Sequence, residues 1–170
     1  WALYIKPAPW SRKLFENLAG SGAYLVTLSV ESMTLNSPAP AYTYSDLESI
    51  MSICRELDIR LAVDLITGIP GETHGSTRRT IDFFKALQPD SVGLNSFIRL
   101  YPGTESTRRV LASDDLRSRL TAAPAGNLMQ SVFYNHVAVE QLREMIDGHP
   151  AFRIEGLERT SNYQRLQRKK

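Results

Sequence analysis

The sequence of 170 residues contains one cysteine, Cys54, and no long hydrophobic run. A single cysteine cannot form an internal disulfide, so nothing in the sequence indicates a secreted, disulfide-stabilised protein. No apolar stretch approaches the roughly 18 residues that a membrane-spanning helix needs, and the first residues lack the layout of a signal peptide. We therefore expect a cytoplasmic chain without membrane contacts.

The charge of the chain is nearly balanced, with 20 Lys and Arg against 18 Asp and Glu. Its composition is 42% hydrophobic and 22% charged, which excludes collagen-like, low-complexity and strongly acidic disordered proteins. The segment 153–170 is an exception, because it carries six basic and two acidic side chains. We interpret it as a solvated chain end rather than a nucleic-acid-binding arm, since short basic ends are common.

Short runs of β-forming residues alternate with helical patterns in the first 105 residues. The predicted strands are 3–5, 24–30, 61–66 and 91–97. Because short links join strand to helix to strand, we expect parallel pairing through right-handed crossovers. The order predicts an α/β fold, either a partial barrel of the TIM type or a doubly wound sheet.

Helices are predicted between these strands. Ser11 is expected to cap the first helix, and Ser45 with Glu48 forms the pattern of a capping box before the second. The second helix carries Cys54 on its apolar stripe, where we expect a buried packing residue. The next helix is predicted over 76–87, and weaker helical patterns follow at 104–112 and 137–146 around a loop at 121–127.

Polar and glycine-containing segments follow three predicted strands, where parallel α/β folds bind ligands. The segments are 29–32 (Ser-Val-Glu-Ser), 64–73 (Asp-Leu-Ile-Thr-Gly-Ile-Pro-Gly-Glu-Thr) and 95–104 (Asn-Ser-Phe-Ile-Arg-Leu-Tyr-Pro-Gly-Thr). Glu31 can hold a ribose or an amino group through charged or bidentate hydrogen bonds, while Gly68 and Gly71 let the backbone approach a flat ligand. Purely structural roles remain open for these residues. Glu31 can equally form an ion pair with a neighbouring loop, and Glu72 and Thr73 can be the first-turn acid and the cap of the next helix.

The order of these segments resembles the second half of a radical S-adenosylmethionine (radical SAM) barrel. Residues 29–32 are similar to the family's G-[IV]-E-S segment after the fourth strand, with Ser29 in place of glycine. Residues 65–73 match the hydrophobic-x-G-[LI]-P-G-E-T segment after the fifth strand, and residues 101–104 match Y-P-G-T after the sixth. The cobalamin-dependent-type and coproporphyrinogen dehydrogenase-like subgroups are the most similar in pattern.

The resemblance implies a fold and a set of ligand-binding residues. Residues 1–105 would form strands three to six of a radical SAM barrel, and residues 106–170 a mostly helical C-terminal extension with a basic tail. In the family, the end of the fourth strand contacts the ribose of SAM and the fifth-strand backbone packs along its adenine. The residues implied are Ser29 and Glu31 for the ribose, Ile66, Thr67 and Gly68 for the adenine, and Ser96 and Phe97 for the adenine or substrate.

The family's cluster-binding segment, C-x-x-x-C-x-x-C, and its Gly-Gly-Glu-type strand are absent from this sequence. One cysteine cannot hold a [4Fe–4S] cluster, and the three histidines have no metal-ligand spacing. The resemblance therefore implies a C-terminal portion of a longer enzyme, inactive alone, whose cluster ligands and any cobalamin site lie outside this chain. The parent would abstract hydrogen from an unidentified small molecule, and the expected partner is its N-terminal half or another chain.

Two other hypotheses remain open. The chain can be a non-catalytic half-barrel that binds a nucleoside or a partner through its open sheet edges. A conventional TIM-barrel aldolase or phosphate-binding fragment is a third possibility, but it predicts a lysine at a strand end. No lysine occupies such a position between residues 24 and 97.

Overall fold

The computed structural model describes residues 1–95, 97–121, 131–134 and 139–155. Five strands form one parallel sheet in the order β1-β2-β3-β4-β8. They are β1 (Ala2–Ile5), β2 (Leu25–Glu31), β3 (Arg60–Ile66), β4 (Ser91–Asn95) and β8 (Phe152–Glu155). The predicted α/β fold with parallel strands is confirmed, and β8 adds a strand that the sequence did not predict.

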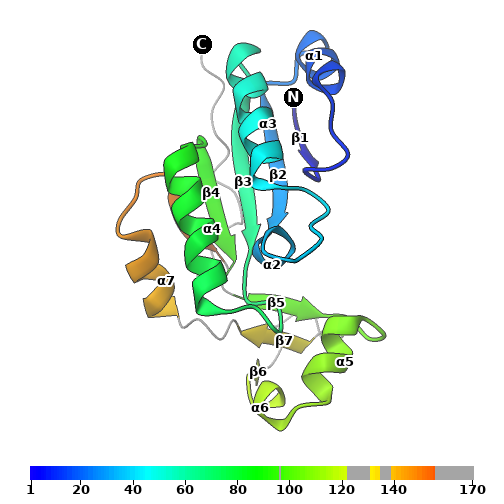
Figure 1. The fold of residues 1–170 in the computed structure, drawn as a ribbon, viewed down its shortest axis with the longest axis vertical. Helices are drawn as coiled ribbons and strands as arrows, with labels where there is room; N and C mark the ends of the chain where they lie inside the picture. The colour runs from blue at the N-terminus through cyan, green and yellow to red at the C-terminus, as the bar shows by residue number, and fades with distance from the viewer. Residues whose placement is uncertain (96, 122–130, 135–138, 156–170) are drawn as a thin grey trace.

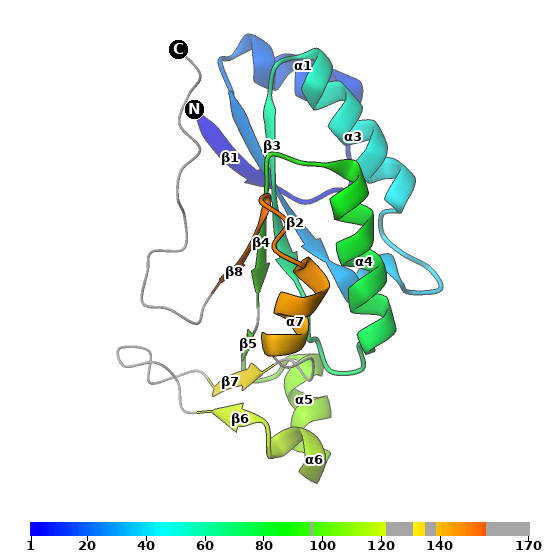
Figure 2. The same ribbon diagram turned by 90° about the vertical axis from the view of Figure 1, so that its left-hand side faces the viewer.

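Helices cover one face of this sheet (Figures 1 and 2). Figure 2 shows α1, α3, α4 and α7 on the same side of the strands, as in a barrel whose helices form the outer layer. Their bounds are α1 (Arg12–Gly20), α3 (Tyr44–Glu56), α4 (His74–Leu87) and α7 (Val139–Ile146), and the short α2 (Ser32–Leu35) follows β2. We call the opposite face of the sheet its inner face.

The start of α3 differs from the predicted capping box at Ser45. The hydroxyl of Thr43 accepts from the amide of Asp46 at 3.2 Å, and the Asp46 carboxylate accepts from the Thr43 amide at 2.8 Å. The capping box is therefore formed by Thr43 and Asp46, and the helix begins at Tyr44. Aspartate can close the box because its shorter side chain still reaches the cap amide.

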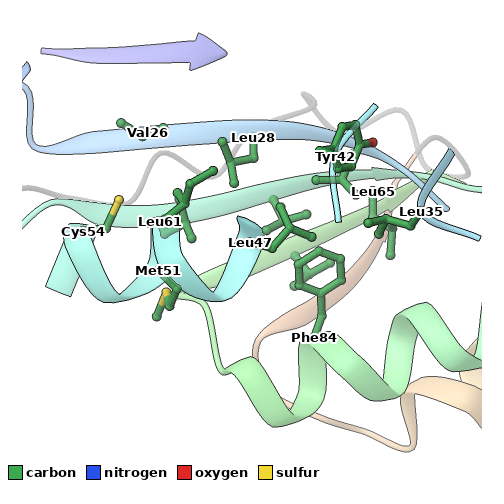
Figure 3. Packing of buried hydrophobic residues seen from close by; sticks show 14 of the residues in the cluster. Val26, Leu28, Leu35, Tyr42, Leu47, Met51, Cys54, Leu61, Leu65 and Phe84 are labelled. Carbon is green, nitrogen blue, oxygen red and sulfur yellow. The ribbon is translucent and has the colours of Figure 1, made fainter. Parts of the chain in front are cut away.

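The hydrophobic core lies between the sheet and these helices (Figure 3). Leu28 and Leu61 point from the strands toward Leu47 of α3 and Phe84 of α4, and all four are fully buried. Each such side chain contributes about 1.5–3 kcal/mol by leaving water. Cys54 is also fully buried in this layer, as predicted from the apolar stripe.

A second, antiparallel sheet has the order β5-β7-β6 and follows the parallel one. Its strands are β5 (Phe97–Leu100), β6 (Leu120–Thr121) and β7 (Ser131–Tyr134), with α5 (Glu105–Leu111) and α6 (Asp114–Arg117) beside them. In both views this module lies beyond the arrowheads of β3 and β4. It therefore stands next to the end of the sheet where those strands stop.

The predicted strand 91–97 is divided between the two sheets. β4 ends at Asn95, whose register partner Ile66 is the last residue of β3. Beyond Ile66 the chain turns away toward α4, so β3 offers no further partner to β4, and Phe97 begins β5. The extension after residue 105 contains helices α5 and α7 at the predicted segments, and its strand β8 joins the parallel sheet. The domain boundary at residue 105 stays a prediction.

Candidate functional site

The strands β2, β3 and β4 end side by side. Glu31 is in register with Ile66, and Ile66 with Asn95, so these residues form a row across the sheet. Gly68 lies two residues after the end of β3, and Phe97, the first residue of β5, lies two residues after the end of β4. The three segments singled out in the sequence thus meet at one end of the sheet, which we call the carboxyl edge.

The inner face of the sheet carries most of its polar side chains. Val63 and Leu65 of β3 pack in the core with the helices, so the residues between and beside them point to the other face. The same alternation holds in the neighbouring strands. The inner-face positions whose side chains are described are Ala2, Tyr4, Leu25, Thr27, Ser29, Glu31, Arg60, Ala62, Asp64, Ile66, Ser91, Gly93, Asn95 and Arg153.

Glu31 is the exposed carboxylate of the carboxyl edge. Its Oε2 accepts from the hydroxyl of Thr34 at 2.9 Å, and its backbone amide donates to the hydroxyl of Tyr42 at 2.8 Å. Tyr42 is 8% exposed, and burial raises its pKa to about 12, with the negative charge of Glu31 adding to the shift. The phenol therefore stays neutral at physiological pH and holds the end of β2 in place.

The loop between β3 and α4 is closed by a buried carboxylate. Glu72 is 5% exposed, and its Oε2 accepts from the backbone amide of Gly68 at 2.5 Å. Gly68 and Gly71 have φ angles of 78° and 103°, which favour glycine. Glu72 thus does not begin the helix as a first-turn acid; Thr73 caps α4 by accepting from the Ser76 amide at 3.1 Å.

The antiparallel module reaches this loop. A Cβ placed on Gly71 would lie 3.5 Å from the side chain of Met33 and 3.9 Å from a guanidinium nitrogen of Arg109 in α5. Arg109 in turn donates to Glu105 at 3.1 Å. The loop is therefore packed between α2 and α5 at the carboxyl edge.

The residues predicted to bind a ligand occupy different environments. Ser29, Glu31 and Ile66 lie on the inner face at or near the carboxyl edge. Thr67 is fully buried, and its hydroxyl donates to the carbonyl of Asn95 at 3.0 Å, so only its backbone borders the edge. The amide of Gly68 is already held by Glu72. Phe97 begins β5, whereas Ser96 lies outside the described residues.

Three inner-face residues were not singled out by sequence reasoning. Asp64 and Asn95 lie within the segments noted there, and the Asn95 side-chain amide donates to Asp64 Oδ1 at 2.7 Å. Arg153 was assigned to a solvated basic tail, but it lies half-buried in β8. The alternation Phe152-Arg153-Ile154 is the signal that predicts a strand there.

The described residues do not fit an iron–sulfur cluster. Cys54 is buried, and burial raises its pKa to about 12, with the charge of Asp90 adding to the effect, so it is a poor thiolate ligand. Within the described ranges, no group of three or more His, Cys, Asp or Glu residues is arranged to hold a metal ion. No described helix has the length and apolar character of a membrane span.

No family model and no curated protein matches the chain. Two solved structures of TsrM, a radical S-adenosylmethionine methyltransferase from Kitasatospora setae, resemble it. The TsrM structure with cobalamin and a [4Fe–4S] cluster bound has a TM-score of 0.71 and 20% identity, covering 92% of this chain and 38% of that chain. The structure with tryptophan substrate and the SAM analogue aza-SAM bound has a TM-score of 0.64 and 18% identity. The match covers 86% of this chain and 34% of that chain.

These similarities bear on the fold. The chain spans little more than a third of the length of TsrM. The low identity does not distinguish between the two subgroups that the sequence resembles. The five parallel strands with their helices have the fold of a part of TsrM.

Proposed function

We propose that this chain supplies the wall that binds the nucleoside of SAM in a radical SAM enzyme. The observation that carries the proposal is the position of Ser29 and Glu31 on the inner face, where β2 ends beside β3. The similarity of the fold to part of TsrM supports it. The parent enzyme would abstract a hydrogen atom from an organic substrate.

The residues of the carboxyl edge suit a nucleoside. The Glu31 carboxylate accepts hydrogen bonds from ribose hydroxyls, and the hydroxyl of Ser29 lies two residues earlier on the same face. The half-buried side chain of Ile66 provides an apolar surface, and the backbone of Thr67 and Gly68 continues it for the adenine ring. Ser96 and Phe97 are proposed to border the adenine or the substrate.

The chain's own residues bind and orient SAM in this proposal. When bound beside a reduced [4Fe–4S] cluster, SAM supplies a deoxyadenosyl radical for hydrogen abstraction. Since Cys54 does not fit as a cluster ligand, the cluster would be held by another part of the parent enzyme. Cobalamin, if the parent uses it, would also be bound outside this chain.

Calorimetric titrations with adenosine and 2′,3′-dideoxyadenosine test the ribose contact. We expect the wild-type chain to bind adenosine about tenfold more tightly, which corresponds to one hydrogen bond to a charged group. Glu31→Gln should lose most of this preference. The matched control is Glu48→Gln, because Glu48 is exposed on α3, away from the carboxyl edge. Equal affinities for the two nucleosides in the wild type would contradict the ribose contact.

A further titration with SAM separates the proposal from a non-catalytic half-barrel. If the chain forms part of a SAM site, SAM binds more tightly than adenosine, because contacts extend beyond the nucleoside. Equal affinities for SAM and adenosine favour a nucleoside-binding half-barrel without catalytic function. The non-catalytic half-barrel is considered because this sequence contains no set of cysteines that could bind a [4Fe–4S] cluster.

A further inference from the structure

The side chain of Glu31 does not take the structural role that its position offers. Glu31 is the N-cap of α2, where a side-chain oxygen commonly accepts from a backbone amide of the first turn. Its carboxylate makes no such bond. Instead, Oε2 accepts from the hydroxyl of Thr34 at 2.9 Å. The contact therefore orients the carboxylate and does not satisfy the start of the helix.

Glu31 is held at two points. Its backbone amide donates to the hydroxyl of Tyr42, and its carboxylate accepts from Thr34. The side chain is exposed, so packing does not restrict its rotatable torsions. The bond to Thr34 is therefore what fixes the direction of the carboxylate.

Thr34 belongs to a helix that is anchored to α4. Ser32 is fully buried, and its hydroxyl lies 2.9 Å from the hydroxyl of Thr80. The side-chain amide of Asn36, which follows α2, donates to the carbonyl of Ser32 at 2.8 Å and to the hydroxyl of Thr80 at 3.0 Å. Such networks rigidify the elements that they join. α2 is thus a fixed support at the end of β2 (Figure 1).

The carboxylate of Glu31 keeps acceptor capacity beside this bond. An ionised carboxylate offers about four lone-pair sites, of which the hydroxyl of Thr34 takes one. The other oxygen, Oε1, has no hydrogen-bond partner in the part of the chain that the structure describes. A ligand with hydroxyl groups can therefore donate to Glu31 without displacing Thr34.

We propose that Thr34 is a positioning residue that holds the Glu31 carboxylate in the orientation that binds the ribose. The hydrogen bond raises the fraction of chains in which the carboxylate is correctly oriented before the ligand arrives. The apparent affinity increases in proportion to this fraction. The inference rests on the proposed function, because the ribose is the group that Glu31 is proposed to bind.

Calorimetric titrations of the full 170-residue chain with adenosine and 2′,3′-dideoxyadenosine test the proposal. The wild type should prefer adenosine by about tenfold, as the ribose contact implies. Thr34→Val keeps the shape of the side chain but removes the hydroxyl, so the preference should fall to about twofold. Thr34→Ser keeps a hydroxyl and should restore most of the preference. The affinity for 2′,3′-dideoxyadenosine should not change, because this nucleoside lacks the 2′ and 3′ hydroxyls.

Thr107→Val is the matched control, because the hydroxyl of Thr107 donates to the carbonyl of Tyr101 at 2.7 Å and not to Glu31. This variant should keep the wild-type preference for adenosine. Urea unfolding measures the stability of each variant separately. If Thr34 only stabilised α2, Thr34→Val would lower the unfolding midpoint and weaken both nucleosides alike. The preference would then be unchanged, which would overturn the inference.

The orientation of Glu31 can also be measured without a ligand. Scalar couplings between its α and β protons report whether χ1 occupies one rotamer or averages over several. We expect one rotamer in the wild type and in Thr34→Ser, and averaging in Thr34→Val. Averaging in the wild type would also overturn the inference, because the carboxylate would not be held.

The two measurements distinguish this inference from the proposed function. An adenosine preference that is the same in the wild type and Thr34→Val would reject the role of Thr34 and retain the nucleoside wall. A single rotamer of Glu31 that depends on Thr34, without any adenosine preference in the wild type, would reject the ribose contact. Thr34 would then still be the residue that orients Glu31.

Discussion

The backbone amide of Glu31 donates to the hydroxyl of Tyr42 at 2.8 Å. This bond ties the exposed end of β2 to a tyrosine that is buried in the core and lies eleven residues further along the chain. Figure 3 shows the hydroxyl of Tyr42 beside the end of that strand. The carboxylate proposed to face the ribose is therefore held by the core rather than by a loose loop.

Removal of this hydroxyl should loosen the end of β2. Tyr42→Phe leaves the amide of Glu31 without its acceptor, so we expect the free energy of unfolding to fall by about 1 kcal/mol. Adenosine affinity should fall with it, because Glu31 is less well positioned. Urea unfolding and calorimetry measure the two effects. Tyr24→Phe is the control, and an equal loss of stability in both variants would show that the bond contributes nothing specific.

The loop before α4 should depend on Glu72. Glu72→Ala removes the buried acceptor of the Gly68 amide, and we expect a loss of about 2 kcal/mol in unfolding free energy. Glu48→Ala, on the exposed side of α3, should change stability by less than about 0.5 kcal/mol. Urea denaturation of the three proteins makes the comparison. Similar midpoints for all three would mean that the carboxylate does not hold the loop.

The corrected start of α3 can be tested directly. Thr43→Ala removes the capping hydroxyl and should destabilise the chain by about 1 kcal/mol, whereas Ser45→Ala should have little effect. Thermal unfolding followed by circular dichroism measures both. The reverse order of the two effects would restore the capping box first expected at Ser45.

Alkaline pH should destabilise the chain through its buried thiol. The pKa of Cys54 is about 12 in the folded chain against an ordinary value of 9.0. Between these values the unfolded chain releases a proton that the folded chain keeps, so the free energy of unfolding falls as pH rises from about 9 toward 12. Tyr42, with a pKa of about 12, adds to this fall above its ordinary value of 10.0.

Urea unfolding of the wild type and Cys54→Ala across this range separates the two groups. The variant should lose the part of the decline that begins near pH 9 and keep the part that begins near pH 10. Identical pH dependence in both proteins would show that the thiol ionises equally well in the folded chain.

Much of the parallel sheet could be predicted from the sequence, because its central strands are continuous apolar runs. β2 and β3 lie within one residue of the predicted bounds, and the helix predicted over 104–112 is observed as α5, which Thr104 caps. The split between β4 and β5 could not be predicted locally. It depends on where β3 stops, which is a property of the pairing and not of residues 91–97.

The candidate site was only partly predictable for the same reason. Ser29 and Glu31 follow an apolar strand and can be recognised from their position in the chain. Arg153 lies 60 residues after Gly93, and the pairing of β8 with β4 brings the two together. Likewise, the role of Glu72 depends on the folded loop, since its carboxylate turns back to the Gly68 amide rather than toward solvent.

The most direct test of the central claim is a chemical-shift map of the backbone amides on addition of adenosine. If the carboxyl edge forms the nucleoside wall, the shifted amides cluster at the end of β2, along the loop that starts at Thr67 and at the end of β4, and the cluster disappears in Glu31→Gln. Shifts confined to the helical face, or shifts at the carboxyl edge that persist unchanged in Glu31→Gln, would contradict the account.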